Sequence, residues 1–210
     1  MVDFVLYVEG GGDTGKLHDA CRRGFRVFLE KAGVTKNRPR IVACGGRSRA
    51  YDKFRTALRE GRRALLLIDS EASVKHTSPW LHLHNRPGDG WTKPDNATDD
   101  HCHLMLECME NWFLADRETL RAFSGQDFRE TALPPRSRDI ETVPKATAID
   151  ALVKATQDCK PTLRYDKGER SFDLLARIDP AKVIKSSRWA KRFVTAVETA
   201  MSAPNPKETP

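Results

Sequence analysis

Residues 64–71 read Ala-Leu-Leu-Leu-Ile-Asp-Ser-Glu, an apolar run that ends in two acidic residues. Residues 4–10, Phe-Val-Leu-Tyr-Val-Glu-Gly, have the same form with a single acid. Apolar runs of this length are typical of strands that are buried on both faces of a parallel sheet. The two runs therefore predict two buried strands, each with carboxylates at its carboxyl end.

Helical and extended patterns alternate around these runs. A helical stripe covers residues 16–32, a second strand is expected at residues 40–44, and a further helix with Ser48 at its N-cap leads to the third strand at residues 63–69. A fourth strand is expected at residues 101–107. This order predicts an α/β fold with a parallel sheet and right-handed crossovers. Functional residues of such sheets gather at the carboxyl ends of the strands.

Glu9, Asp69 and Glu71 are expected to meet at that edge of the sheet. Asp69 and Glu71 are two residues apart, so in an extended segment both side chains point to the same face. A pair of carboxylates about 4 Å apart repel by roughly 4 kcal/mol at an effective dielectric near 20. Mg²⁺ or Mn²⁺ would remove this cost, because hard cations prefer carboxylate oxygens and water. We therefore expect the three acids to hold one or two metal ions.

A metal centre of this kind indicates phosphodiester hydrolysis. A two-metal site activates a water molecule and stabilises the leaving oxygen. The net charge of +7 at pH 7 agrees with a polyanionic substrate such as nucleic acid. The alternative is that the acids are solvated and cap helices, because Asp-x-Glu is a weak pattern by itself.

The glycine-rich loop at residues 10–16, Gly-Gly-Gly-Asp-Thr-Gly-Lys, has the spacing of a phosphate-binding P-loop. The next residue is Leu17, where that loop needs Ser or Thr to bind Mg²⁺. Glu9 and Asp13 also place negative charge where the phosphates of a nucleotide would lie. We therefore interpret the loop as a tight turn that aims Glu9 and Asp13 at a metal, and a phosphotransferase is the less favoured alternative.

The second expected strand ends at the same edge in two glycines and two arginines. We expect the glycines and arginines of this edge to bind the substrate, with the arginine side chains on its phosphates. These candidates are Gly10, Gly45, Gly46, Arg47 and Arg49.

Glu110 is a further candidate ligand. It lies three residues after Glu107, and the two would share one face of a helix. Glu110 then either completes the metal site or caps the start of the helix and interacts with its dipole, and the residues favour neither reading. The histidines at residues 82–103 lack the spacing of known zinc sites, so zinc is disfavoured.

The domain organisation follows from where these patterns stop. Residues 1–116 are expected to form the core, interrupted at residues 72–100 by a connection rich in proline and glycine that is either a lid or a disordered insertion. Helical patterns fill residues 117–202 as a C-terminal extension, with the last helix at residues 181–201. Residues 203–210, with three prolines, are expected to be a disordered tail.

Several features of the chain predict a cytoplasmic location without a membrane partner. No apolar stretch approaches the ~20 residues that a membrane span needs. The start of the chain lacks the basic residues and apolar core of a signal peptide. The five cysteines are odd in number and form no Cys-x-x-Cys pair, which favours a reducing compartment.

The acidic positions resemble those of the Toprim domain of topoisomerases, primases and overcoming-lysogenization-defect nucleases. That family has a Glu after its first strand and an Asp-x-Asp or Asp-x-Glu pair after its third. The matching residues here are 8–10 (Val-Glu-Gly), Asp13 and 68–71 (Ile-Asp-Ser-Glu). Residues 109–116 (MENWFLAD) and 165–167 (Tyr-Asp-Lys) are similar to elements of an uncharacterised bacterial Toprim-like family, domain of unknown function 4276, often encoded beside ATPases of anti-phage systems.

This resemblance implies a Toprim-like, Rossmann-like sheet, mostly parallel and flanked by helices, in an endonuclease that uses Mg²⁺ or Mn²⁺. It implies Glu9 as general base or metal ligand, and Asp69 and Glu71 as ligands. Asp13 is a weaker ligand candidate. Lys167 is implied as the cation that stabilises the charge of the phosphorane.

The resemblance also implies a biological setting. The chain would be the effector of an anti-phage defence system, with nucleic acid, taken as DNA, as its substrate and the ATPase subunit of the same system as its partner. Two departures from the Toprim pattern are the Glu in place of a second Asp and the long insertion. The alternative is a non-catalytic Toprim-like adaptor that binds and regulates the ATPase.

Overall fold

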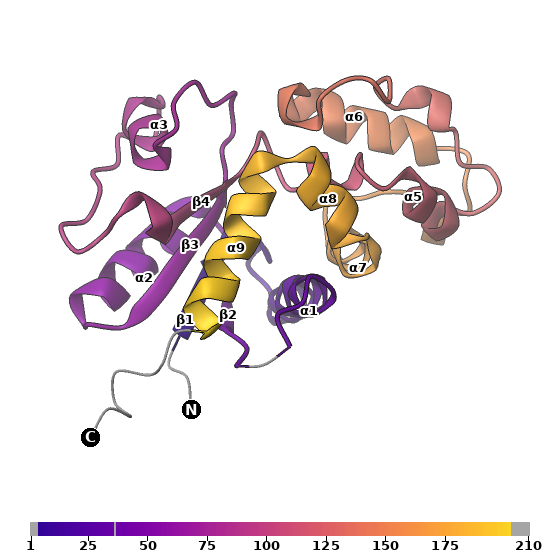
Figure 1. The fold of residues 1–210 in the computed structure, drawn as a ribbon. Coiled ribbons are helices and arrows are strands. Elements are labelled where there is room, and N and C mark those ends of the chain that lie inside the picture. Colours follow the sequence, from indigo (N-terminus) through magenta and orange to yellow (C-terminus); the bar gives the residue numbers. More distant parts are fainter. Residues whose placement is uncertain (1–3, 36, 203–210) are drawn as a thin grey trace.

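The computed structural model describes residues 4–35 and 37–202, which form a four-stranded sheet with helices on both faces (Figure 1). The strand order is β2-β1-β3-β4, and every pairing is parallel. The arrangement is an α/β, Rossmann-like fold, as the alternating sequence patterns predict. The strands are β1 (Phe4–Val8), β2 (Arg40–Ala43), β3 (Arg63–Asp69) and β4 (Cys102–Met105).

The register of β1 against β3 determines where the acids that follow them lie. Val8, the last residue of β1, pairs with Leu67, two residues before the end of β3. The pairing continues for one more bond, since the Glu9 N–H donates to the Leu67 carbonyl at 2.9 Å. Glu9 and Asp69 therefore leave neighbouring strands at the same edge of the sheet.

Alternate residues of β1 face the two layers of helices. Leu6 belongs to the core that includes α1 (Gly15–Lys31), whereas Tyr7 belongs to the core that includes α2 (Arg47–Arg59). Both residues are buried, which explains why the strand is apolar throughout.

The remaining helices follow along the chain. Those from α5 to α8, residues 117–186, form a helical part beside the sheet (Figure 1). A close approach joins α7 to α1, because a Cβ at Gly24 would lie 2.8 Å from the Phe172 carbonyl oxygen. The helices are α3 (Pro79–Asn85), α4 (Glu110–Phe113), α5 (Arg117–Ser124), α6 (Lys145–Thr156), α7 (Glu169–Arg177), α8 (Pro180–Ser186) and α9 (Arg188–Ser202). Short 3-10 turns are η1 (Asp99–His101), η2 (Glu130–Ala132), η3 (Ile140–Thr142) and η4 (Pro161–Leu163).

Two helix boundaries differ from the sequence expectation. The single helix expected at residues 181–201 is two helices, because Ser187 is extended at φ −138° and its Oγ accepts the Ala190 N–H as the N-cap of α9. Gly46, not Ser48, is the N-cap of α2, since Gly46 is the last extended residue before the helix.

The connection at residues 72–100 covers the α2 side of the sheet as ordered chain. Trp80 of α3 is buried, and its ring stacks on Phe54 of α2 with 6.0 Å between centroids. Trp91 stacks on Tyr51 with 4.5 Å between centroids. These contacts pack the connection against α2. The expected tail at residues 203–210 lies outside the described residues.

The cysteines and the helices give two further findings. All five cysteines are buried with free thiols. Among the residues that the structure describes, no helix combines the length and the apolar character that crossing a membrane requires.

The string at residues 109–116 is a junction between the sheet and the helical part. The side-chain amide of Asn111 donates to the carbonyls of Ile140 and Val143, both at 2.7 Å. Trp112 is fully buried and stacks on an aromatic ring of α1 and on one of α9. This string therefore holds the two parts of the fold together.

Asp116, the last residue of this string, joins two helix starts. Its buried carboxylate accepts hydrogen bonds from the Thr119 N–H and hydroxyl, the Asp179 N–H and the Lys182 ammonium. Burial alone would raise the pKa of Asp116, but the hydrogen bonds from Lys182, Thr119 and Asp179 outweigh burial and lower it to about 2. The ionised form is therefore the one that stabilises the fold.

We expect Asp116→Asn to lower the free energy of unfolding by about 1 to 2 kcal/mol at pH 7, after allowing for solvent screening around Lys182. Because the folded-state pKa lies below the ordinary value of 3.8, this contribution is complete above pH 3.8 and is lost as the pH falls through about 2. Urea unfolding at pH 7 and near pH 2 measures both effects. Asp127→Asn, at an exposed position, is the matched control. Equal destabilisation by the two variants would contradict the assignment.

Candidate metal centre

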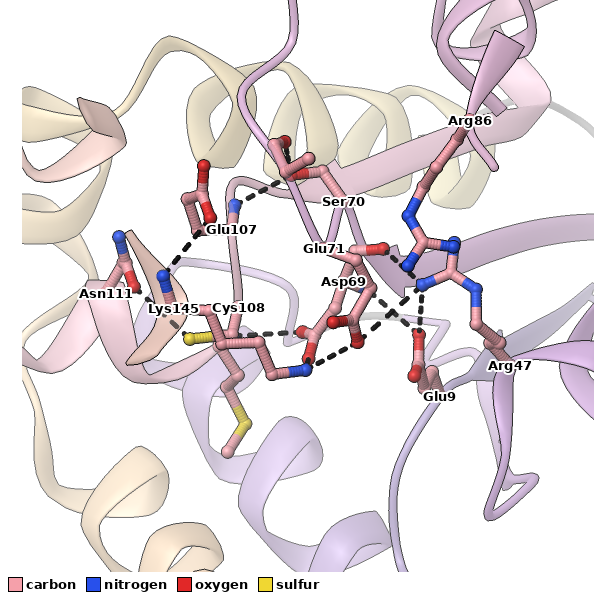
Figure 2. Close-up of polar contacts among 12 residues, drawn as sticks. Glu9, Arg47, Asp69, Ser70, Glu71, Arg86, Glu107, Cys108, Asn111 and Lys145 are labelled. Atoms are coloured by element: carbon pink, nitrogen blue, oxygen red, sulfur yellow. Dashed lines mark hydrogen bonds and ion pairs between the residues drawn. The ribbon is translucent and has the colours of Figure 1, made fainter. Parts of the chain in front are cut away.

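The carboxyl edge of β1 and β3 brings three acids together (Figure 2). Glu9, Asp69 and Glu71 each offer a carboxylate oxygen, and these oxygens lie within 4.8 Å of one another. Asp69 is almost fully buried, whereas the side chains of Glu9 and Glu71 are 16% and 20% exposed. The group is therefore open to solvent on one side.

Backbone hydrogen bonds fix the carboxylates of Glu9 and Asp69. Glu9 follows β1 directly, and its Oε2 accepts the Asp69 N–H at 3.0 Å. Asp69 is the last residue of β3, and its Oδ1 accepts the Met109 N–H at 3.0 Å. Each carboxylate is thus oriented by the end of a neighbouring strand or loop.

Glu71 joins the group from a left-handed backbone conformation and not from the extended conformation expected from strand alternation. It lies two residues beyond β3 with φ +62°, in the left-handed region that few non-glycine residues adopt. Its N–H donates to the Glu107 carbonyl at 3.0 Å, and Glu107 has φ +58°. Two paired backbone distortions therefore place Glu71, and such distortions concentrate at functional sites.

Burial and repulsion weaken the acidity of the group. Burial, reinforced by the charge of Glu9, raises the pKa of Asp69 to about 8. Burial likewise raises the pKa of Glu9, although Arg47 opposes the change. The ionised group therefore favours any cation that can approach it.

Arg47, at the start of α2, lies on one side of the acids. Its Nη1 is 3.7 Å from a carboxylate oxygen of both Glu9 and Glu71, and it donates to the Asp69 carbonyl at 3.1 Å. Asp89 holds the guanidinium through two hydrogen bonds of 2.9 and 2.7 Å. Arg47 was expected to contact substrate phosphates, and the structure places it against the acids (Figure 2) and in hydrogen bonds with Asp89.

Lys145, the first residue of α6, lies on another side of the acids and was not predicted. Its Nζ is 2.5 Å from Glu71 Oε1 and 3.3 Å from Asp69 Oδ2. Burial disfavours its charge, but Asp69 and Glu71 together raise the pKa of Lys145. No local pattern marks this lysine among the 36 basic residues of the chain, and only the fold shows that it meets acids 76 and 74 residues away.

Three predicted residues lie outside the group of acids. Asp13 follows a turn of three glycines with positive φ, and its exposed carboxylate pairs at 2.7 Å with the exposed side chain of Arg49 in α2. Glu110 is buried and accepts the Tyr165 hydroxyl at 2.8 Å. Asp13 and Arg49 therefore do not have the positions expected for a ligand and a phosphate contact.

Glu107 and Glu110 do not share a helix face, contrary to expectation. Glu107 lies before α4 in a left-handed conformation, and Glu110 is the first residue of that helix. The Glu110 hydrogen bond to Tyr165 connects the string at residues 109–116 with the one at residues 165–167. The two sequence elements thus meet in space.

A cavity of about 260 Å³ adjoins the acids. It is lined by Glu9, Asp69, Glu110, the glycine loop, Lys167 and Phe172, together with other apolar side chains. Lys167 therefore lies beside the candidate centre, and Lys145 is the lysine in direct contact with the acids.

Gly10, Gly45 and Gly46 have structural roles at this edge of the sheet. Gly10 and Gly45 donate their N–H groups to each other's carbonyl at 2.8 Å. A Cβ at Gly45 would lie 2.6 Å from the Gly12 carbonyl oxygen, at φ +70°. Gly46 caps α2. The N–H groups of Gly10 and Gly45 thus bind each other's carbonyls, while both residues line the cavity beside the acids.

The donor set fits a hard divalent cation. All three donors are carboxylate oxygens, the ligands that Mg²⁺ and Mn²⁺ prefer, and no histidine or cysteine belongs to the group. Within residues 4–35 and 37–202 no other cluster of such side chains has this geometry. His103 is buried against Phe193 with a hydrogen bond to the Asp100 carbonyl, apart from the acids.

Comparison with known proteins gives one match. The model of a family described as a domain of unknown function (DUF4276) matches residues 8–198. This range contains all three acids and both cations that contact them. No curated protein and no solved structure matches the chain.

The left-handed conformation of Glu71 predicts an unusual response to glycine. We expect Glu71→Gly to be more stable than Glu71→Ala by about 1 kcal/mol, because only the alanine variant keeps the backbone strain while both lose the carboxylate. Urea unfolding of the two variants measures the difference. Ala72→Gly is the control, since φ at Ala72 is outside the left-handed region and glycine should destabilise there. An alanine variant as stable as the glycine variant would show that Glu71 is unstrained.

Proposed function

The chain belongs to the DUF4276 family, and from this premise we propose that it is a Mg²⁺- or Mn²⁺-dependent nuclease of Toprim type that cleaves phosphodiester bonds. The convergence of Glu9, Asp69 and Glu71 at the carboxyl edge of the sheet is the observation that carries this proposal. The acids come from separate segments and are held by backbone hydrogen bonds, so their meeting is built into the fold.

The residues around the acids suit phosphoryl chemistry. When bound, a divalent ion would supply activation of water and stabilisation of the leaving oxygen. Glu9, Asp69 and Glu71 would hold the ion, and Glu9 would alternatively accept the proton of the attacking water. Arg47 and Lys145 hold positive charge beside the acids, where it would stabilise the charge of a phosphorane formed at this edge, and Lys167 lines the adjoining cavity.

The substrate and the setting rest on charge and resemblance. The net charge of +7 favours a polyanion, and the resemblance to Toprim nucleases favours DNA. The same resemblance suggests an anti-phage effector that works with an ATPase subunit in the cytoplasm, where thiols such as the five free cysteines remain reduced.

A non-catalytic adaptor for the ATPase is the second candidate. The observation in its favour is that Arg47 and Lys145 already pair with all three acids. Two cations next to three carboxylates compensate most of the negative charge without a metal ion. A Toprim-like protein of this kind would bind its partner and cleave nothing.

We expect the chain to nick supercoiled plasmid DNA in the presence of Mg²⁺ or Mn²⁺, alone or with the proposed ATPase partner. Glu9→Gln and Asp69→Asn each remove a ligand charge and should reduce nicking by about 100-fold or more. Asp13→Asn is the control, since Asp13 is an exposed acid close in sequence whose carboxylate pairs with Arg49. Undiminished nicking by Asp69→Asn would refute the proposed chemistry.

Calorimetry separates the nuclease from the adaptor. The nuclease predicts that Mn²⁺ binds the wild-type chain and that Asp69→Asn abolishes the binding. The adaptor predicts tight binding to the ATPase and no heat on addition of Mg²⁺ or Mn²⁺. Circular dichroism of Asp69→Asn confirms that a lost signal does not reflect unfolding.

A further inference from the structure

We infer that Lys145 takes the place of a second metal ion, so that the centre binds a single divalent cation. This inference rests on the proposed function, because it presupposes that Glu9, Asp69 and Glu71 bind metal. It assigns a role to a lysine that lies outside the core expected from the sequence.

The position of the Lys145 ammonium is the first argument. Lys145 Nζ bridges Asp69 Oδ2 at 3.3 Å and Glu71 Oε1 at 2.5 Å (Figure 2). In two-metal sites the ions lie roughly 3.5–4 Å apart, so they share the carboxylates between them. An ammonium group between two of three carboxylates fills the space that a shared second ion would need.

The second argument is the use of the carboxylate oxygens. Asp69 Oδ1 accepts the Met109 N–H, and Glu9 Oε2 accepts the Asp69 N–H. Lys145 contacts one further oxygen of Asp69 and one of Glu71. The other oxygens of Glu9 and Glu71 make no hydrogen bond within the described residues. Mg²⁺ is usually held by one or two carboxylates and several waters, so two oxygens without hydrogen bonds, together with the carboxylate of Asp69, suit one ion better than two.

The third argument is charge. In the ionised form that binds metal, the three acids carry three negative charges, and Arg47 and Lys145 contribute two positive charges beside them. One divalent ion would change the local sum from −1 to +1, whereas two ions would raise it to +3. Like charges a few ångströms apart are costly at intermediate dielectric, so a second ion is disfavoured while Lys145 stays in place.

Lys145 is held at this position by its backbone. Its N–H donates to Glu107 Oε2 at 3.1 Å, and the Glu107 N–H donates to Ser70 Oγ at 2.7 Å. Because the Glu71 N–H donates to the Glu107 carbonyl, one residue fixes both the lysine and the acid that it contacts. The Lys145 side chain is only 23% exposed, so this is not a surface lysine that meets an acid by chance.

The test is the number of Mn²⁺ ions bound per chain, measured by calorimetry and by electron paramagnetic resonance on the full chain without substrate. We expect one ion for the wild type and for Lys145→Arg, which keeps the charge. Lys145→Ala should bind two, because the space and the charge that exclude the second ion are gone. Lys167→Ala is the matched control and should bind one, since Lys167 lines the adjoining cavity without a contact to the acids within the described residues.

The outcomes distinguish a failure of the Lys145 inference from a failure of the nuclease proposal. Two ions in the wild type would overturn the role of Lys145 and leave the nuclease proposal intact. A single ion in folded Lys145→Ala would also overturn it. No ion in the wild type would refute the proposed function itself. If Lys145→Ala fails to fold, Lys145→Met replaces it, because methionine keeps the aliphatic stem without the charge. The number of ions bound by the wild type tests the inference in either case.

Discussion

Mutual repulsion among the carboxylates of Glu9, Asp69 and Glu71 shapes what surrounds them. The parallel register of β1 and β3 places two of them side by side, and the burial of Asp69 removes the water that would screen them. N–H donors from the end of β3 and from the turn before α4 stabilise the carboxylates, as do cations from the first turns of α2 and α6. A helix of the core, α2, and a helix of the C-terminal part, α6, thus both contact one cluster of negative charge.

The left-handed residues Glu71 and Glu107 show that this edge departs from relaxed geometry. Their backbones hydrogen-bond to each other, and Asn37 is the other non-glycine residue with positive φ in the described part of the chain. Conformations of this kind cost of order 1 kcal/mol each and persist where surrounding contacts impose them. Their pairing beside the acids indicates that this edge is shaped by a requirement other than stability.

The sequence was sufficient for the sheet and for the meeting of the acids, because both depend on local runs. Apolar segments such as residues 64–68 reveal buried parallel strands, and topology then brings their carboxyl ends together. Lys145 and Asp89 were missed, since each reaches the centre through long-range packing that leaves no local pattern. Asp13 was misplaced because the direction of a glycine turn depends on φ values that composition does not reveal.

The junction formed by Asn111 and Trp112 bears on how relatives of this chain should be compared. These side chains join α4 to the chain before α6 and to the aromatic layer of α1, and neither contacts the acids. A homologue that retains them but has lost Asp69 would keep the same architecture while lacking the cluster. Recognition of the string at residues 109–116 therefore identifies ancestry, and chemical competence must be judged position by position at the strand ends.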